Sequence, residues 1–175
     1  MKIKDLYEIY KSHSVISTDT RTIENGCLFF ALKGENFNGN KYAKDALKKG
    51  AAYVIIDEEK FKKSDNYILV DDVLQTLQDL ANYHRKQLSI PFIGITGTNG
   101  KTTTKEFINA VLDKKYKTAY TKGNLNNHIG VPLTLLSIPN DCEIAIIEMG
   151  ANHVGEIDFL CKITEPAHAG GRQCR

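Results

Sequence analysis

Short continuous apolar runs alternate along the chain with segments in which apolar residues recur every three or four positions. The continuous runs predict buried strands at residues 27–32, 53–56, 67–70, 92–95 and 144–147, and a further short strand is expected at residues 117–120. The periodic segments predict helices at residues 3–12, 41–49, 73–88, 102–113, 128–137 and 155–162. Asp71 and Asp72 are the candidate N-caps of the third helix. Because strands and helices alternate, we expect an α/β fold with parallel pairing.

A break at residues 88–91 divides the chain, since Pro91 interrupts the long helical pattern before the strand that starts at Phe92. We expect residues 1–88 to form a small α/β domain. Residues 89–175 are expected to form the first part of a second α/β domain with a parallel sheet. A length of 175 residues is compatible with one or two domains.

The composition, 42% hydrophobic and 25% charged, is that of a globular protein and excludes collagen-like and disordered classes. No apolar run approaches the about 18 residues that cross a bilayer. The N-terminal segment carries charges and lacks an apolar block, so we expect no secretion signal and a cytoplasmic location. The four cysteines form no CxxC pair and are expected to be reduced thiols. Cys161, His168 and Cys174 match no standard zinc spacing.

The charge is nearly balanced, with 23 Lys and Arg against 21 Asp and Glu and a net charge of +2. Neither half of the chain carries a basic run. Proteins that bind nucleic acid usually carry such a footprint, so nucleic acid is not an expected partner.

Residues 92–105 combine a predicted strand, a glycine-bearing loop and a predicted helix, in the order that a phosphate-binding loop needs. Glycines let backbone N–H groups line a concave loop, and the helix start adds unpaired N–H groups. Lys101 is expected to reach the β- and γ-phosphates, and the Thr102 hydroxyl to coordinate Mg²⁺. The predicted nucleotide-binding residues are Gly97, Thr98, Asn99, Gly100, Lys101, Thr102 and Thr103.

This loop departs from the strict pattern G-x-x-x-x-G-K-[ST], because Ile95 stands where that pattern has its first glycine. Glycines occur at 94 and 97 instead. A glycine-rich turn without a nucleotide is the alternative. The strand, the Gly-Lys-Thr sequence and the helix signal together favour the phosphate-binding interpretation.

Glu148 ends the apolar run at 144–147, and an acid at the carboxyl end of a buried strand beside a phosphate loop is well placed to hold Mg²⁺. The alternative is an ordinary solvated acid at a strand end. We therefore assign catalytic roles to Lys101 and Glu148, and metal ligation to Thr102 and Glu148.

Three amides and an imidazole cluster before the helix predicted at 128–137. Asn126, Asn127 and His128 either cap that helix or bind a polar ligand, and the residue types alone leave both alternatives open.

Three segments in the second half of the chain resemble the Mur ligases, the ATP-dependent amide-forming family of peptidoglycan synthesis. Residues 96–103 resemble its variant phosphate loop, and residues 147–150 resemble its acidic Mg²⁺ motif. Residues 123–134 resemble the branch that joins D-alanyl-D-alanine to UDP-N-acetylmuramoyl-tripeptide. In the first half, residues 17–21 and 26–39 resemble the domain that holds the UDP end of the substrate. The resemblance implies that residues 1–88 form this UDP-substrate-binding domain and that residues 89–175 form an incomplete ATP-binding domain. The resemblance extends from about residue 15 to about residue 166.

The resemblance implies that ATP phosphorylates the substrate carboxylate and that an amine attacks the resulting acyl phosphate, with ATP and Mg²⁺ as cofactors. It also implies a set of substrate-binding residues: Thr18, Asp19, Thr20, Arg21, Lys33, Gly34, Asn126, Asn127 and His128. Other Mur branches, a folylpolyglutamate-type ligase and a non-catalytic fragment that binds a UDP-sugar or nucleotide are the alternatives. The oligomeric state is left open.

The last residues depart from the family, whose members are far longer and continue after Pro166 with a strand and further nucleotide contacts. Residues 167–175 are polar and have no strand pattern. We therefore expect an incomplete second domain and a chain that is inactive alone. His168 is not assigned the family's metal-binding role on position alone.

Overall fold

The computed structural model describes residues 1–170 and divides into two compact units, Met1–Tyr83 and His84–Arg175. Helix α3 (Val73–Gln87) crosses the division. Both units are of the α/β class with parallel main sheets, which confirms the predicted fold class. The assignment of residues 1–88 and 89–175 to a substrate domain and a nucleotide domain stays a prediction.

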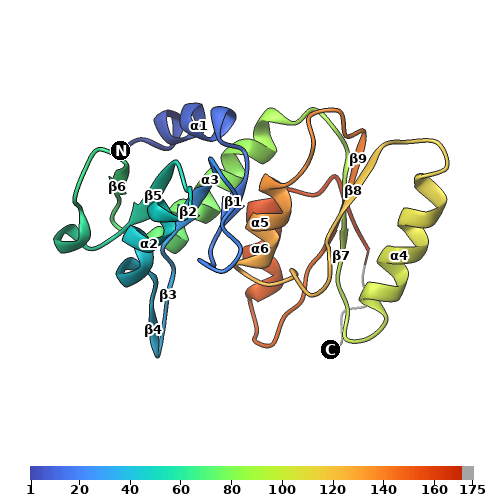
Figure 1. The fold of residues 1–175 in the computed structure, drawn as a ribbon. Helices are drawn as coiled ribbons and strands as arrows, with labels where there is room; N and C mark the ends of the chain where they lie inside the picture. Colours follow the sequence, from blue (N-terminus) through green and yellow to red (C-terminus); the bar gives the residue numbers. More distant parts are fainter. Residues whose placement is uncertain (171–175) are drawn as a thin grey trace. The chain divides into compact units, whose positions relative to one another are not determined.

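The first unit is built on a four-stranded parallel sheet of order β1-β2-β5-β6 (Figure 1). Apolar side chains of β2 and β5 pack with α2 in a core that includes Phe29, Val54 and Ile56. Its strands are β1 (Ile16–Ser17), β2 (Leu28–Phe30), β5 (Tyr53–Ile56) and β6 (Tyr67–Leu69), with a hairpin of β3 (Lys33–Gly34) and β4 (Phe37–Asn38). Its helices are α1 (Ile3–Ser12) and α2 (Ala43–Lys48), with 3₁₀ turns at Gly39–Tyr42 and Glu59–Phe61.

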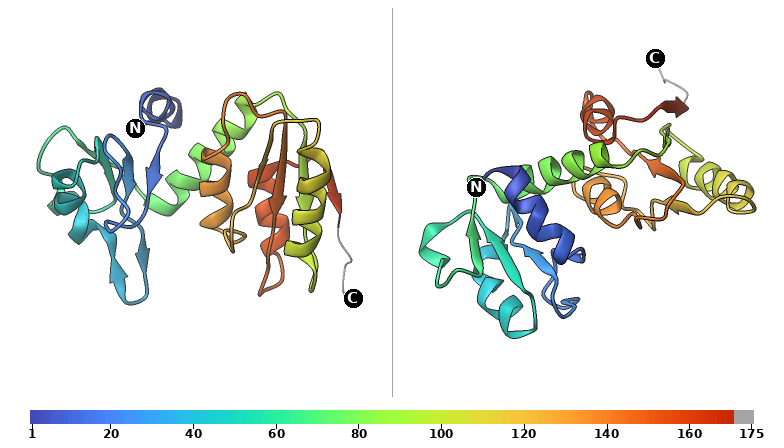
Figure 2. Two further views of the ribbon diagram at one scale, coloured as in Figure 1. Left: turned by 45° about the vertical axis from the view of Figure 1, so that its right-hand side comes forward. Right: turned by 90° about the horizontal axis from the view of Figure 1, so that it is seen from above.

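The second unit is a parallel sheet of order β10-β7-β9-β8, with α4 on one face and α5 and α6 on the other (Figures 1 and 2). The strands are β7 (Phe92–Ile95), β8 (Thr118–Tyr120), β9 (Ile144–Glu148) and β10 (His168–Gly170). The helices are α4 (Lys101–Leu112), α5 (Gly130–Leu136) and α6 (Glu156–Thr164). The central strands β7 and β9 are covered on both faces, so their sequences are almost continuously apolar.

The structure corrects the interpretation of residues 167–170 as having no strand. His168–Gly170 form β10, which pairs in parallel with β7, and the Ala167 amide donates to the Phe92 carbonyl over 3.0 Å. Backbone groups form a strand ladder, so a short edge strand needs no apolar pattern of its own. The short strands β1, β3 and β4 were missed for the same reason. Cys174, part of the zinc set considered above, lies outside the described residues.

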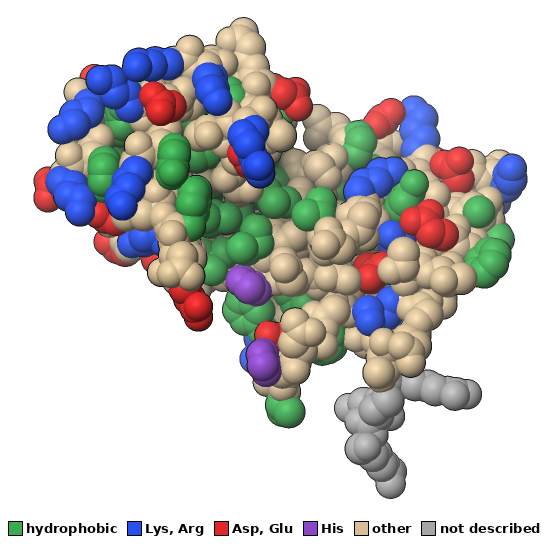
Figure 3. Space-filling view, turned by 60° about the horizontal axis from the view of Figure 1, so that its bottom comes forward, with side chains coloured by type: hydrophobic (Ala, Val, Ile, Leu, Met, Phe, Trp, Pro, Cys, Tyr) green, Lys and Arg blue, Asp and Glu red, His purple; other side chains and the backbone are tan. Residues whose placement is uncertain are grey.

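The surface carries both signs of charge. Figure 3 shows Lys and Arg side chains mixed with Asp and Glu on the visible face of each unit. Within residues 1–170, the helices are all too short or too polar to span a bilayer.

Arg85 ties three parts of the second unit together. Its Nε and Nη2 atoms donate to the carbonyl oxygens of Thr164 and Glu165, over 2.8 and 2.9 Å, at the end of α6. Its guanidinium also lies 3.8 Å from the centre of the Phe92 ring on β7. One side chain therefore satisfies two terminal helix carbonyls and covers the first residue of the central strand.

We expect Arg85→Ala to lower the free energy of unfolding by about 2–3 kcal/mol, since charged hydrogen bonds and a cation–π contact are lost together. Urea unfolding followed by circular dichroism measures the change. The neighbouring Lys86 forms an exposed ion pair with Glu165 over 3.2 Å. Lys86→Ala is the matched control and should change stability by no more than about 0.5 kcal/mol. Equal losses in the two variants would contradict the role given to Arg85.

Candidate functional site

The loop between β7 and α4 has the backbone of an anion-binding turn. Gly97 and Gly100 have φ angles of +142° and +77°, in a region that residues with a side chain rarely adopt. Helix α4 begins directly after Gly100, so its unpaired N–H groups and positive dipole end border the loop. Gly97 therefore provides the backbone conformation that this loop needs, although the strict phosphate-loop pattern has its first glycine at position 95 instead.

The predicted nucleotide-binding side chains are accessible around this turn. Thr98, Asn99, Thr102 and Thr103 are exposed. Lys101 is half-buried, and its ammonium donates to the Gly97 carbonyl over 2.7 Å. The ammonium is therefore held over the loop at the start of α4.

Glu148 reaches the same place through strand pairing. In the parallel ladder of β7 and β9, Glu148 is the register partner of Ile95, the residue just before the loop. Its side chain is buried, and the Thr102 hydroxyl donates to its Oε1 atom over 3.2 Å. The structure thus brings together the two residues that the sequence paired for metal binding.

The donor set fits a magnesium ion. Two neighbouring ligands of an octahedral Mg²⁺ with metal–oxygen bonds of about 2.1 Å lie about 3.0 Å apart. Thr102 Oγ1 and Glu148 Oε1 lie 3.2 Å apart, and both are the hard oxygen donors that Mg²⁺ prefers. Among the described residues there is no group of three or more His, Cys, Asp or Glu side chains placed to hold a metal. Mg²⁺ usually keeps waters and phosphate oxygens as its remaining ligands.

The amide cluster divides between the two roles that the sequence left open. Asn127 Oδ1 accepts hydrogen bonds from the N–H groups of Ile129 and Gly130, at 3.1 and 2.8 Å, so it caps α5. Asn126 Nδ2 instead donates to Glu148 Oε1 over 2.8 Å. His128 is exposed. The pKa of Glu156 is lowered mainly by hydrogen bonds from the N–H groups of Asn152 and His153, and the charge of His128 makes the smallest contribution. Of the three residues, Asn126 contacts the candidate metal site.

The first unit contains a separate cavity of about 500 Å³, lined by Thr18, Asp19, Thr20, Arg21, Phe29, Phe37 and Tyr42. Phe37 and Tyr42 stack with ring centres 5.4 Å apart and an interplanar angle of 11°. Their exposed fractions, 50% and 41%, leave aromatic surface open at the cavity. Such surface suits a planar ring.

Four of the six substrate-binding residues predicted in this unit line the cavity, and two do not. Lys33 forms an ion pair with Asp57 over 3.1 Å. Gly34 is the register partner of Phe37 in the β3–β4 hairpin, so its backbone lies beside that of a lining residue. Asp19 binds Arg21, and the hydrogen bonds from the Arg21 side chain and backbone lower the pKa of Asp19 to about 2.

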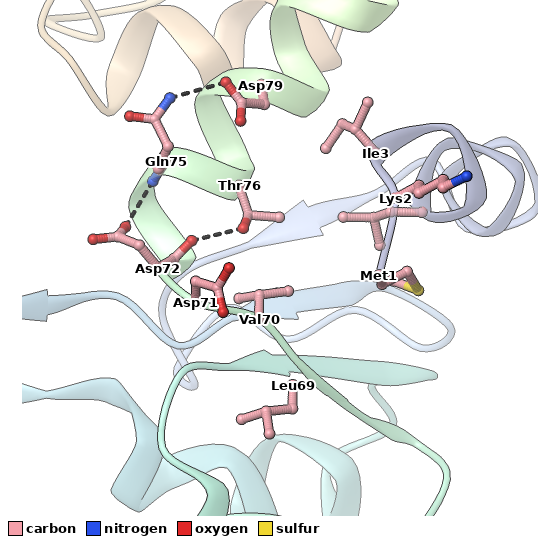
Figure 4. Close-up of a pocket in the computed structure, with 11 residues that line it drawn as sticks. Met1, Lys2, Ile3, Leu69, Val70, Asp71, Asp72, Gln75, Thr76 and Asp79 are labelled. Atoms are coloured by element: carbon pink, nitrogen blue, oxygen red, sulfur yellow. Dashed lines mark hydrogen bonds between the residues drawn. The ribbon is translucent and has the colours of Figure 1, made fainter.

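Another hollow, of about 340 Å³, lies between α1 and the start of α3 (Figure 4). Three carboxylates line it, and two of them bind the helix beside them. Asp72 Oδ1 accepts from the Gln75 N–H over 2.8 Å, which identifies Asp72 as the side chain that caps α3. Asp79 accepts from Gln75 Nε2 over 2.9 Å. These contacts are typical of helix stabilisation.

Two features near the candidate sites were not predicted from the sequence: Lys105, which is fully buried with its ammonium 3.7 Å from Glu148 Oε2, and the aromatic pair Phe37 and Tyr42. In the sequence, Lys105 follows the polar residues 101–104 and is indistinguishable from a lysine on the exposed face of a helix. Phe37 and Tyr42 are aromatic residues in an otherwise polar loop, and this unusual composition could have indicated a binding surface.

The fold and the site define a class: an α/β protein with a glycine-bearing loop between a strand and a helix, and a strand-end carboxylate beside that loop. The chain belongs to the Mur ligase family. Residues 13–85 match the model of the Mur ligase family, catalytic domain, and residues 95–170 match the Mur ligase middle domain.

Curated relatives of the chain include UDP-N-acetylmuramoyl-tripeptide–D-alanyl-D-alanine ligases. The protein of Bacillus subtilis is 46% identical over 162 residues, which are 91% of this chain and 35% of the relative. The Escherichia coli protein is 40% identical over 154 residues, 88% of this chain and 34% of the relative. The chain therefore spans about a third of the length of the curated relatives that it matches.

Solved structures agree with the fold. MurF from Acinetobacter baumannii superposes with a TM-score of 0.85 at 33% identity, covering 97% of this chain and 40% of that chain. MurF ligase from Thermotoga maritima, solved in complex with ADP, superposes with a TM-score of 0.80 at 34% identity, covering 95% of this chain and 37% of that one.

We expect Arg21→Ala to raise the pKa of Asp19 from about 2 towards its ordinary value of 3.8, because the main hydrogen-bond donor to the carboxylate is removed. A carboxyl NMR titration measures the pKa. Since the folded-state pKa is depressed, the stability linked to this pair is present above pH 3.8 and is lost as the pH falls through 2. Lys49→Ala is the control and should give a smaller rise, because Lys49 is the weakest of the causes. A larger rise in the control would refute this account.

Proposed function

We propose that this chain carries the ATP-binding and UDP-substrate-binding residues of a ligase that joins D-alanyl-D-alanine to UDP-N-acetylmuramoyl-tripeptide. The proposal rests on one observation: the pairing of β7 with β9 brings Glu148 to the loop that follows β7. The residues that lie together there are Gly97, Gly100, Lys101, Thr102 and Glu148. The similarity to curated ligases of this specificity supports the choice of substrates.

In this proposal the nucleotide phosphates lie in the loop, against the N–H groups at the start of α4. Thr98, Asn99 and Thr103 border the phosphates, and Lys101 supplies the positive charge. Thr102 and Glu148 would hold Mg²⁺, which would neutralise charge on the phosphate oxygens. The relative solved in complex with ADP supports nucleotide binding by this family.

The UDP end of the substrate is assigned to the cavity of the first unit. The stacked pair of Phe37 and Tyr42 would receive the uracil ring, since aromatic surfaces bind bases by stacking. Thr18, Thr20 and Arg21 offer hydroxyl and guanidinium donors for the diphosphate and sugar.

The reaction follows from the activation of a carboxylate. A substrate carboxylate oxygen takes the γ-phosphoryl group of ATP, and ADP leaves. The amine of D-alanyl-D-alanine then attacks the acyl phosphate, inorganic phosphate leaves, and the nitrogen loses a proton to give the amide. Lys101 lowers the barrier because it neutralises charge on the transferring group. We assign no described residue to D-alanyl-D-alanine.

We expect the chain to bind Mg·ATP, and Lys101→Ala to weaken that binding at least tenfold, because the cation over the phosphates is lost. Isothermal titration calorimetry measures both affinities. Lys115→Ala is the matched control, since it removes an exposed lysine just beyond the same helix, and it should leave the affinity unchanged. An unaltered affinity in Lys101→Ala would rule out the proposed phosphate site.

We expect Tyr42→Ala to weaken binding of UDP-N-acetylmuramoyl-tripeptide about tenfold, because base stacking contributes about 1–3 kcal/mol. Binding of UDP alone should weaken by the same factor, since the stacking partner is the base. Phe107→Ala is the control: Phe107 is also exposed, at 69%, but lies on α4 in the other unit. If Tyr42→Ala and Phe107→Ala bind UDP equally well, the uracil does not lie on this aromatic pair.

A further inference from the structure

Lys105 is a fully buried lysine one turn beyond Lys101 on helix α4. Its side chain has an exposed fraction of 0%, whereas the neighbouring residues Thr104 and Glu106 are exposed. A buried ammonium is costly unless it is paired and hydrogen-bonded. Because it lies away from solvent, Lys105 is not a phosphate-binding residue, and its charge acts inside the protein.

The Lys105 ammonium has three polar neighbours. It donates to the Thr121 carbonyl over 2.7 Å and lies 3.1 Å from Glu106 Oε1. It also lies 3.7 Å from Glu148 Oε2. Glu106 is half exposed, so Glu148 is the only one of the two carboxylates that is buried with the lysine.

The two oxygens of Glu148 have different surroundings. Oε1 accepts hydrogen bonds from Asn126 and Thr102, over 2.8 and 3.2 Å. Oε2 is buried and accepts no hydrogen bond, so the Lys105 charge is what compensates it. The Glu148 backbone is tied to the same place, because its N–H donates to the Thr121 hydroxyl over 2.9 Å while Lys105 binds the Thr121 carbonyl.

We propose that Lys105 is a positioning residue for the metal site: its charge holds Oε2 inside the protein, so that Oε1 faces Thr102. The inference rests on the proposed nucleotide site and adds to it a residue that contacts neither metal nor nucleotide. Residues that orient a metal ligand commonly change metal affinity by about 10- to 100-fold when replaced. A lysine that only stabilised the packing of α4 on β8 would not act on Glu148.

The first test reads the orientation of Glu148 without nucleotide or metal. The Asn126 side-chain N–H₂ signals in a ¹⁵N NMR spectrum report its hydrogen bond to Glu148 Oε1, and Asn126→Ala assigns them. Lys105→Met keeps the length of the side chain and removes the charge, and it should shift these signals. Glu106→Gln, which changes only the exposed partner of Lys105, should not shift them. Unshifted signals in Lys105→Met would overturn the proposal.

The second test reads the metal site. We expect Lys105→Met to raise the Mg²⁺ concentration that half-maximally promotes ADP binding by about tenfold or more, with the metal-free ADP affinity unchanged. Glu106→Gln should match the unaltered protein. An unchanged Mg²⁺ dependence in Lys105→Met overturns the proposal. If the unaltered chain binds no nucleotide, the proposed function fails, and the Asn126 signals alone decide the role of Lys105.

If Lys105→Met does not fold, the double variant Lys105→Met/Glu148→Gln decides. When the lysine serves mainly to compensate Glu148, neutralising both side chains restores folding, because no unpaired buried charge remains. A double variant that stays unfolded shows that Lys105 supports packing independently of Glu148 and overturns the proposal.

Discussion

The parallel pairing of β7 with β9 is the constraint on which the rest of the second unit depends. Glu148 and the loop that starts after Ile95 are far apart in the chain, and the ladder makes Ile95 and Glu148 partners. The connection from β7 through α4 leads to the edge strand β8, and β9 then inserts between them. The order of strands thus reverses beside β7, and ligands of open α/β sheets bind at such points.

This pairing also creates an electrostatic problem, because it buries a carboxylate. A buried charge is tolerated only when paired and hydrogen-bonded. Asn126 and Thr102 approach one oxygen, and Lys105 approaches the other from within α4. The helix that begins with Lys101 and Thr102 beside the loop therefore also supplies, through Lys105 on its buried side, the counter-charge for Glu148.

Most of the fold was predictable because its central strands are buried on both faces. Burial requires continuous apolar runs such as those of β7 and β9, and these are visible in the sequence. The strands that escaped prediction, β1, β3, β4 and β10, have two or three residues each. Backbone hydrogen bonds to a neighbour define such strands, so their side chains carry little signal.

The candidate site was predictable only where the backbone demands a residue type. Glycines at positive φ and the Gly-Lys-Thr start of a helix mark the loop, but Asn126 and Asn127 are chemically identical neighbours with different tasks. One amide points along its own chain to cap α5, and the other meets a strand that lies elsewhere in the sequence. The role of Lys105 was likewise not predictable, because it too depends on contacts with distant segments of the chain. Its burial depends on β8 and β9 closing over α4, and a helix pattern alone does not reveal which polar residue that packing encloses.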